Sequence, residues 1–203
     1  MLTIIDFKMG NLHSVYKAFD RIGCEAVISD DPATINMATK IIIPGVGHFK
    51  RGMENLKSQG LVDILDQKVL VEKVPVLGIC LGMQLMTQFS EEGDVAGLGW
   101  VNARVRKFDS SKLSGLKVPH MGWNEIKVLK NSSILSYSII QNSYYFVHSY
   151  FVDPLNNNDI LAETNYGIDF CSAFEHENII GVQFHPEKSH KTGLDILKNF
   201  AAL

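Results

Sequence analysis

The sequence has few cysteines, no large excess of positive or negative charge, and no long apolar run. Its three cysteines, an odd number without C-x-x-C spacing, fit neither a disulfide framework nor a zinc site. Nineteen Lys and Arg residues stand against 22 Asp and Glu, so no surface for nucleic acid is predicted. No apolar run approaches the roughly 18 residues of a membrane span, and the start M-L-T-I-I-D is unlike a signal peptide. We therefore expect a cytoplasmic protein that binds neither nucleic acid nor membrane.

The composition is that of one folded domain. Hydrophobic residues fill 46% of the 203 positions and charged residues 20%, which allows a sizeable core. No pair among the seven histidines has the spacing of a metal site. We expect a single domain over residues 1–203, with no metal and no cofactor.

The first half of the chain alternates short β-rich runs with segments of helical period. Between the first two runs, apolar residues recur at helical spacing, with Asn11 suited to begin a helix and Gly23 to end it. The runs suit buried parallel strands and cover residues 2–6, 25–29, 40–44 and 75–79. This order predicts an open, mostly parallel α/β sheet with helices on both faces and ligands beyond the carboxyl ends of its strands.

The second half has shorter strand candidates with more alternation of polar and apolar residues. We interpret them as an antiparallel extension of the same domain. A last amphipathic helix is predicted over residues 193–202. The strand candidates cover residues 124–128, 144–150, 160–165, 170–175 and 179–184.

The stretch G-I-C-L-G, Gly78 to Gly82, lies where the fourth strand turns into a helix. It has the form of a nucleophile elbow, in which glycines remove the clashes of a tight turn around Cys80. Free N–H groups at the helix start favour negative charge on the sulfur, and the N–H of Leu81 can face an oxyanion. The alternative is a buried cysteine that packs as a small hydrophobe.

A thiol nucleophile needs a base, and the base needs an orienting group. The stretch G-V-Q-F-H-P-E offers His185 as the base and Glu187 to fix its tautomer. A histidine at a strand end is more often structural, but here it occurs in one chain with the elbow. His120 and His148 are alternative bases; neither has a carboxylate within three residues downstream, so we interpret them as lining or recognition residues.

The stretch P-G-V-G, Pro44 to Gly47, closes the third strand. Its two glycines allow a loop that presents backbone N–H groups to an oxyanion, and even let a peptide plane turn over. Taken alone, it is equally typical of an ordinary glycine-rich turn.

Together, P-G-V-G, G-I-C-L-G-M-Q-L and G-V-Q-F-H-P-E-K-S resemble the class I glutamine amidotransferases, the glutaminases that use a triad. The stretches P-H-M-G-W-N and Y-F-V-H-S-Y are similar to those of the glutaminase subunits of imidazole glycerol phosphate synthases. The likeness covers nearly the whole chain.

The resemblance implies that Cys80 attacks the side-chain amide of glutamine, His185 protonates the departing ammonia, and water then hydrolyses a γ-glutamyl thioester. Glu187 completes the triad. It further implies an oxyanion hole of Val46, Gly47 and Leu81, and glutamine-binding positions at Gly47, Gln84, Glu92, His148, Ser149 and Tyr150.

The resemblance also implies a partner. Ammonia would pass to a separate (β/α)8-barrel cyclase in a heterodimer that makes imidazole glycerol phosphate and aminoimidazole carboxamide ribotide for histidine biosynthesis. Activity would stay low until the partner, with bound substrate, reorients the P-G-V-G peptide. Asn11 and Trp123 are our choices for the contact face.

The chain departs from the family pattern at Phe7, Lys8 and His48, none of which belongs to the triad. A related subunit that supplies ammonia for acetamidino groups on surface sugars is an alternative. A thiol peptidase or γ-glutamyl hydrolase acting alone is disfavoured, because Gln84, Glu92 and the F-V-H-S-Y segment fit a small amino-acid pocket better. A silent regulatory subunit is disfavoured by the intact triad positions.

Overall fold

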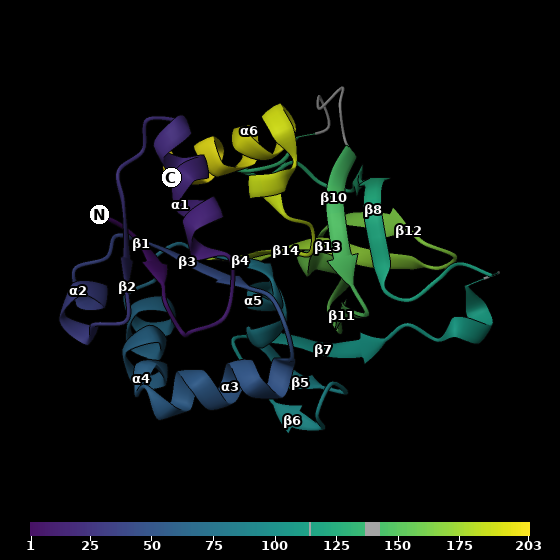
Figure 1. The fold of residues 1–203 in the computed structure, drawn as a ribbon, viewed down its shortest axis with the longest axis horizontal. Helices are drawn as coiled ribbons and strands as arrows, with labels where there is room; N and C mark the ends of the chain where they lie inside the picture. Colours follow the sequence, from purple (N-terminus) through teal and green to yellow (C-terminus); the bar gives the residue numbers. More distant parts are fainter. Residues whose placement is uncertain (114, 137–142) are drawn as a thin grey trace.

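The computed structural model describes residues 1–113, 115–136 and 143–203. Five parallel strands form one side of its large sheet, in the order β2-β1-β3-β4-β14 with β2 at the edge (Figure 1). All residues of β4 are buried, as a strand covered on both faces requires. The strands are β1 (Leu2–Ile5), β2 (Ala26–Ser29), β3 (Lys40–Gly45), β4 (Val76–Cys80) and β14 (Ile179–Val182).

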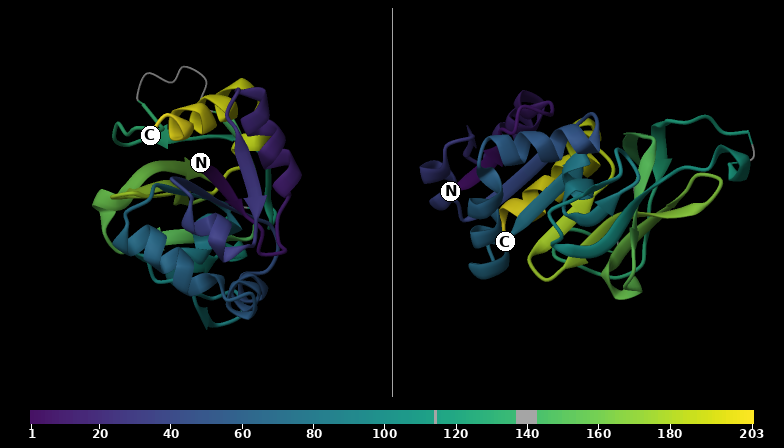
Figure 2. Two further views of the ribbon diagram at one scale, coloured as in Figure 1. Left: turned by 90° about the vertical axis from the view of Figure 1, so that its left-hand side faces the viewer. Right: turned by 90° about the horizontal axis from the view of Figure 1, so that it is seen from below.

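Helices cover both faces of this sheet, as predicted (Figures 1 and 2). On one face α1 (Leu12–Arg21) and α6 (His190–Ala201) share a hydrophobic cluster with β1. The predicted start of α1 is confirmed, because the Asn11 side chain accepts a hydrogen bond from the Ser14 N–H. The other face carries α2 (Pro32–Asn36), α3 (Phe49–Ser58), α4 (Leu61–Asp66) with the π-helical turn Gln67–Val71, and α5 (Leu81–Leu85).

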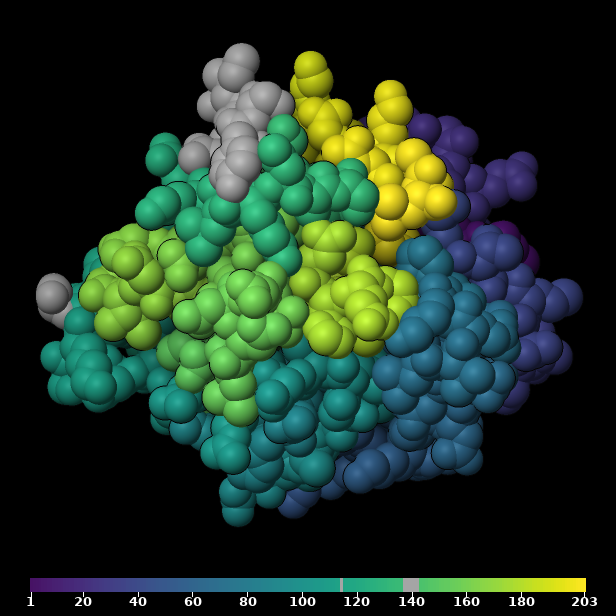
Figure 3. Space-filling model, turned by 180° about the vertical axis from the view of Figure 1, so that it is seen from behind, coloured from purple at the N-terminus to yellow at the C-terminus, as the bar shows by residue number. Residues whose placement is uncertain are grey.

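An extension continues the sheet beyond β14 in the order β13-β11-β7-β5-β6, and most of its pairs are antiparallel. Seen from behind, the blue residues of the N-terminal half lie on the right and the green residues of the extension on the left, with lime-coloured residues between them and the yellow C-terminal helix above (Figure 3). The strands are β5 (Thr87–Ser90), β6 (Val95–Ala96), β7 (Val101–Lys107), β11 (Tyr150–Pro154) and β13 (Asp169–His176), with β12 (Ile160–Asn165) and β9 (Lys127–Val128) paired beside β13.

Three details of the predicted extension were wrong. The single strand predicted over residues 124–128 is the end of β8 (His120–Glu125) and the short strand β9, which belong to different sheets. β14 is antiparallel to β13 but parallel to β4, so it closes the parallel part of the sheet. The single strand predicted over residues 144–150 is two strands, because the chain leaves one sheet and enters another at Ser149. β10 (Ser143–His148) pairs with β8 in a separate two-stranded sheet, and β11 joins the large sheet.

Within the residues that the structure describes, no helix is long and apolar enough to cross a membrane.

Candidate active site

Cys80 is the last residue of β4 and lies in the left-handed backbone region, with φ 55°. A non-glycine residue in this region is strained, which is typical of a nucleophile elbow. Packing requires glycine at Gly78 and Gly82, because neighbouring backbone atoms occupy the space that a Cβ would need. A Cβ on Gly82 would lie 1.6 Å from the Ile43 carbonyl oxygen, and one on Gly78 would lie 2.6 Å from the Met83 nitrogen.

His185 follows β14, the strand directly beside β4, so the topology brings it next to the elbow. Its Nδ1 lies 2.8 Å from Oε1 of Glu187, and both side chains are only 2% exposed. Because Nδ1–H donates a hydrogen bond to the Glu187 carboxylate, Nε2 is the ring nitrogen available to another partner. That nitrogen is buried and has no hydrogen bond to another group of the described residues.

The charge balance at His185 favours an imidazolium. Burial alone would lower the pKa of His185, but the adjacent Cys80 sulfur and the Glu187 carboxylate outweigh it, so the pKa is raised. The ring can therefore hold a proton at neutral pH beside the sulfur.

The Cys80 sulfur has two further polar neighbours. It lies 3.9 Å from the Val147 carbonyl oxygen and 3.6 Å from Nε2 of Gln183. Sequence reasoning missed Gln183, although it stands two residues before His185. Residues two apart in an extended segment point to the same side, and this is the signal that could have found it.

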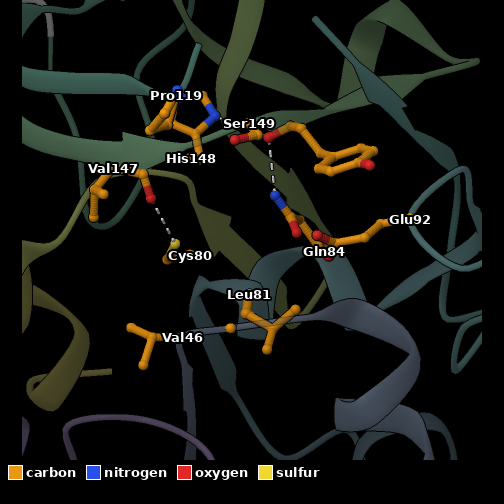
Figure 4. Close-up of a pocket in the computed structure, with 11 residues that line it drawn as sticks. Val46, Cys80, Leu81, Gln84, Glu92, Pro119, Val147, His148 and Ser149 are labelled. Carbon is orange, nitrogen blue, oxygen red and sulfur yellow. Dashed lines mark hydrogen bonds between the residues drawn. The ribbon is translucent and has the colours of Figure 1, made fainter.

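One cavity of about 290 Å³ opens above Cys80 (Figure 4). The structure brings every predicted oxyanion-hole and glutamine-binding residue to its wall, although they come from distant segments. Its lining also includes Pro119 and Val147, which the sequence did not indicate. The lining residues are Val46, Gly47, Cys80, Leu81, Gln84, Glu92, Pro119, Val147, His148, Ser149 and Tyr150.

Two polar side chains of the wall are held by hydrogen bonds. Gln84 Nε2 donates to the Tyr150 carbonyl oxygen and to Oε1 of Gln183, each at 3.0 Å. Glu92 Oε2 accepts from the backbone N–H of Phe49 at 2.7 Å, at the start of α3. Glu92 thus ties the wall to the helix that follows the P-G-V-G loop.

The P-G-V-G loop lies beside the elbow because Gly45 pairs with Cys80 across β3 and β4. Gly47 has φ +110°, a conformation that favours glycine, and a Cβ there would lie 2.7 Å from Cε of Met9. The side chain of Val46 is 39% exposed.

The residues chosen for the contact face lie outside the cavity lining. Asn11 is exposed at the start of α1, and Trp123 of β8 is 48% exposed and stacks on the ring of His190 at 4.9 Å. Of the departures, Phe7 is buried, Lys8 pairs with Asp6 and Asp30 at the surface, and His48 precedes α3 without capping it by its side chain.

Among the described residues, no group of three His, Cys, Asp or Glu side chains is placed to hold a metal ion.

Comparison with known proteins decides the family. The sequence pattern of "Glutamine amidotransferase class-I" matches residues 3–203. The chain belongs to the class I glutamine amidotransferases. Two relatives of this amidotransferase are named "Imidazole glycerol phosphate synthase subunit HisH 2": the protein of Methanococcus maripaludis, 53% identical over 98% of each chain, and that of Pseudomonas aeruginosa, 44% identical over the whole of each. The resemblance predicted from the sequence is confirmed.

Solved structures with low sequence identity share the amidotransferase fold. One described as a glutamine amidotransferase has a TM-score of 0.74 at 17% identity and covers 100% of this chain and 99% of its own. The glutaminase domain of Trypanosoma brucei CTPS, solved with bound acivicin, has a TM-score of 0.64 at 18% identity and covers 99% and 93%. The predicted fold class, a mostly parallel sheet between helices with an antiparallel extension, is confirmed.

Proposed function

We propose that this amidotransferase is the glutaminase subunit of an imidazole glycerol phosphate synthase in histidine biosynthesis. It hydrolyses glutamine to glutamate and ammonia and passes the ammonia to a (β/α)8-barrel cyclase. The observation that carries the chemistry is the strained Cys80 next to the buried His185–Glu187 pair, at a cavity lined by the glutamine-binding positions. The assignment of the subunit is supported by relatives of matching length that are named HisH.

The first half of the reaction is acyl transfer to sulfur. The Cys80 sulfur attacks the side-chain amide carbon, and the N–H groups of Leu81 and of the Val46–Gly47 loop stabilise the oxyanion. The His185 imidazolium gives its Nε2 proton to the amide nitrogen, the C–N bond breaks, and ammonia leaves. The γ-glutamyl group is then held as a thioester on the sulfur.

The second half is hydrolysis of that thioester. Neutral His185 takes a proton from water, and the hydroxide attacks the thioester carbon. The C–S bond breaks, glutamate leaves, and the sulfur–imidazolium pair is restored. Glu187 holds Nδ1–H in both halves, so Nε2 always faces the reacting atoms.

The cavity favours one amino acid over a peptide as substrate. About 290 Å³ is near the small end of ligand pockets, and Gln84 and Glu92 supply amide and carboxylate groups within it. We infer that the ammonia leaves toward a partner docked on the face that carries Asn11 and Trp123. Binding of the partner would set the Val46–Gly47 peptide for the oxyanion.

The first test is Cys80→Ala in the complex with the barrel cyclase. Glutamine-dependent synthesis should fall by at least about 10³-fold, because the nucleophile is lost, while synthesis from added ammonia should persist. Cys24→Ala, a half-buried thiol outside the cavity lining, is the matched control and should keep both activities. Equal loss of both activities in Cys80→Ala would contradict the division of labour.

The same assay separates the pathway from its alternative. Glutaminase rate should rise when the histidine-pathway cyclase and its ligand are added to the isolated chain. An unchanged rate, together with a rise on adding a partner from the acetamidino-sugar pathway, would assign the subunit to surface polysaccharide synthesis.

A further inference from the structure

His120 and His148 form a buried pair directly behind the glutamine pocket. They face each other across the β8–β10 ladder and are 2% and 6% exposed. Nδ1 of His120 lies 3.0 Å from Nε2 of His148. His148 lines the cavity, whereas His120 is not among its lining residues. The proposed reaction uses neither ring nitrogen of His120.

The partners of the pair fix where each hydrogen lies. His148 Nδ1 is 2.8 Å from the Tyr150 carbonyl oxygen, which can only accept, so Nδ1 carries the hydrogen. A neutral His148 therefore accepts at Nε2, and His120 must donate to it from Nδ1. The remaining nitrogen, Nε2 of His120, accepts from Nδ2 of Asn124 at 3.2 Å. Every ring nitrogen of the pair is thus hydrogen-bonded in one direction, from Asn124 to Tyr150.

The surroundings keep both rings neutral. Burial lowers the pKa of His120 to about 4, and burial lowers the pKa of His148 to about 3. Burial and the positive charge of His185 outweigh the hydrogen bond to the Tyr150 carbonyl, which favours a proton on His148. The rings that pack on the pair are aromatic and comprise Phe108, Phe146, Tyr166 and Phe170.

The hydrogen bonds of the histidine pair end at the Tyr150 carbonyl oxygen, which lies in the wall of the pocket. The Tyr150 oxygen accepts from His148 on one side and from Gln84 on the other. The bond from His148 to Tyr150 closes the bend over Ser149, at which the chain passes from the small sheet to the large one. The bend carries Ser149 and Tyr150 into the cavity wall.

We propose that His120 is a positioning residue for glutamine: by donating to His148 it fixes the hydrogen of that ring and so holds the Ser149–Tyr150 wall of the pocket. The kinetic part of this proposal rests on the proposed glutaminase function. The pair cannot serve as a base for Cys80, because all four ring nitrogens are engaged elsewhere.

Two substitutions at His120 distinguish the effect of its hydrogen-bond donor from the effect of its ring shape. His120→Phe keeps a ring but leaves the buried Nε2 of His148 without a donor, whereas His120→Asn places an amide N–H near the original Nδ1. In the complex, His120→Phe should lower kcat/KM for glutamine at least about tenfold and leave ammonia-dependent synthesis within about twofold. His120→Asn should recover most of the loss. His176→Asn, at a part-buried histidine of β13 outside the cavity lining, is the control and should change neither rate.

A structural measurement decides the proposal independently of activity. Long-range ¹H–¹⁵N correlation spectra of the wild-type chain should show the hydrogen on Nδ1 of both rings. The backbone amides of Ser149 and Tyr150 should shift in His120→Phe and stay close to wild type in His120→Asn. An Nε2–H ring in either histidine, or a wild-type kcat/KM in a folded His120→Phe, would overturn the proposal. If His120→Phe does not fold, the wild-type spectra and His120→Asn still decide it. A wild-type complex with the cyclase and its ligand that lacks glutaminase activity, although the isolated chain gives these spectra, would instead refute the proposed function.

Discussion

The Cys80 sulfur sits between an imidazolium and a neutral amide donor. The His185 ring supplies the charge, and Gln183 points its NH₂ at the sulfur from 3.6 Å. The orientation of that amide is set on its other side, because Oε1 of Gln183 accepts from Gln84. The Gln183 side chain is fully buried, so its hydrogen bonds are not shared with solvent.

Gln183→Leu should make the Cys80 sulfur less reactive. The substitution keeps the side chain's bulk but removes the N–H donor that faces the buried sulfur, so alkylation by iodoacetamide near neutral pH should slow about tenfold. Gln183→Glu should slow it further, since a carboxylate opposes negative charge that develops on the sulfur. Alkylation would be followed by mass spectrometry of the Cys80 peptide in a Cys24→Ala background. Thr3→Val, another fully buried polar residue, is the control for core perturbation, and equal rates in all variants would exclude a role for Gln183.

At the scale of the element, the elbow depends on contact between α5 and the adjacent strand β3. The segment after Cys80 turns so tightly that the Gly82 Cα lies against the Ile43 carbonyl. Here glycine is needed for space and not for its backbone freedom, because Gly82 is not among the positive-φ residues.

Gly82→Ala should therefore destabilise the protein more than a glycine replacement at a left-handed position. We expect a loss of about 3 kcal/mol or more in the free energy of unfolding, because a backbone carbonyl cannot yield as a side chain can. Gly23→Ala is the matched control. Its site is open but has φ +73°, and it should cost about 1–2 kcal/mol. Urea unfolding of both variants measures the difference; a smaller loss in Gly82→Ala would mean that α5 can move away from β3 at little cost.

The same elements show what sequence reasoning can reach. The apolar runs of the first half gave β1 to β4 within a residue or two. β1, β3 and β4 are almost wholly buried and leave a continuous apolar signal, whereas the edge strand β2 is part-exposed. The break at Ser149 left no such signal, since Y-Y-F-V-H-S-Y-F-V reads as one strand without a glycine or proline. β5, β6 and β7 were not placed, and the two-stranded sheet was not predicted.

Local motifs pointed to the residues of the candidate site. The elbow and Q-F-H-P-E indicated the cysteine, the histidine and the glutamate of the triad, and the family resemblance was needed to favour their catalytic roles over structural ones. The contacts of Gln183 with the sulfur, the position of Pro119 in the wall and the bonding of His120 were not predictable, because each joins segments far apart in sequence. Whether Asn11 and Trp123 face a partner stays a prediction.

At the scale of the whole molecule, the adjacency of β4 and β14 creates the site. These parallel strands end at the same edge of the sheet, so Cys80 and His185 meet beyond their carboxyl ends. β14 is also where the parallel half joins the antiparallel extension, and the extension supplies the wall at Tyr150 through β11. The pocket is thus bounded by both halves of the sheet, and its integrity depends on the whole fold.

Because the two buried histidines have lowered pKa values, the free energy of unfolding depends on pH between those values and the unfolded value. An unfolded histidine takes up a proton near pH 6.5, whereas the native fold holds the pKa of His120 at about 4 and that of His148 at about 3. Between these limits the unfolded state binds more protons, so stability falls as pH falls, by up to about 2.7 kcal/mol per pH unit for two groups. His185, whose pKa is raised, is protonated in both states well below pH 6.5 and adds no slope there. Near pH 6.5 it adds a smaller slope of opposite sign, which is the same in wild type and His120→Asn.

Replacing His120 should therefore flatten the acid limb of the stability curve. Urea unfolding between pH 4.5 and 6.5 should show a slope about half as steep in His120→Asn as in wild type, because one of the two proton uptakes is removed. The carboxylates with lowered pKa are Asp30, Asp31 and Asp109, with an unfolded value of 3.8, and Glu177, with an unfolded value of 4.5. Their contribution is lost mainly below this window and is the same in wild type and His120→Asn. His13→Asn should keep the wild-type slope. Parallel curves for wild type and His120→Asn would show that His120 is protonated in the native state, and the one-directional hydrogen bonding of the pair would then be wrong.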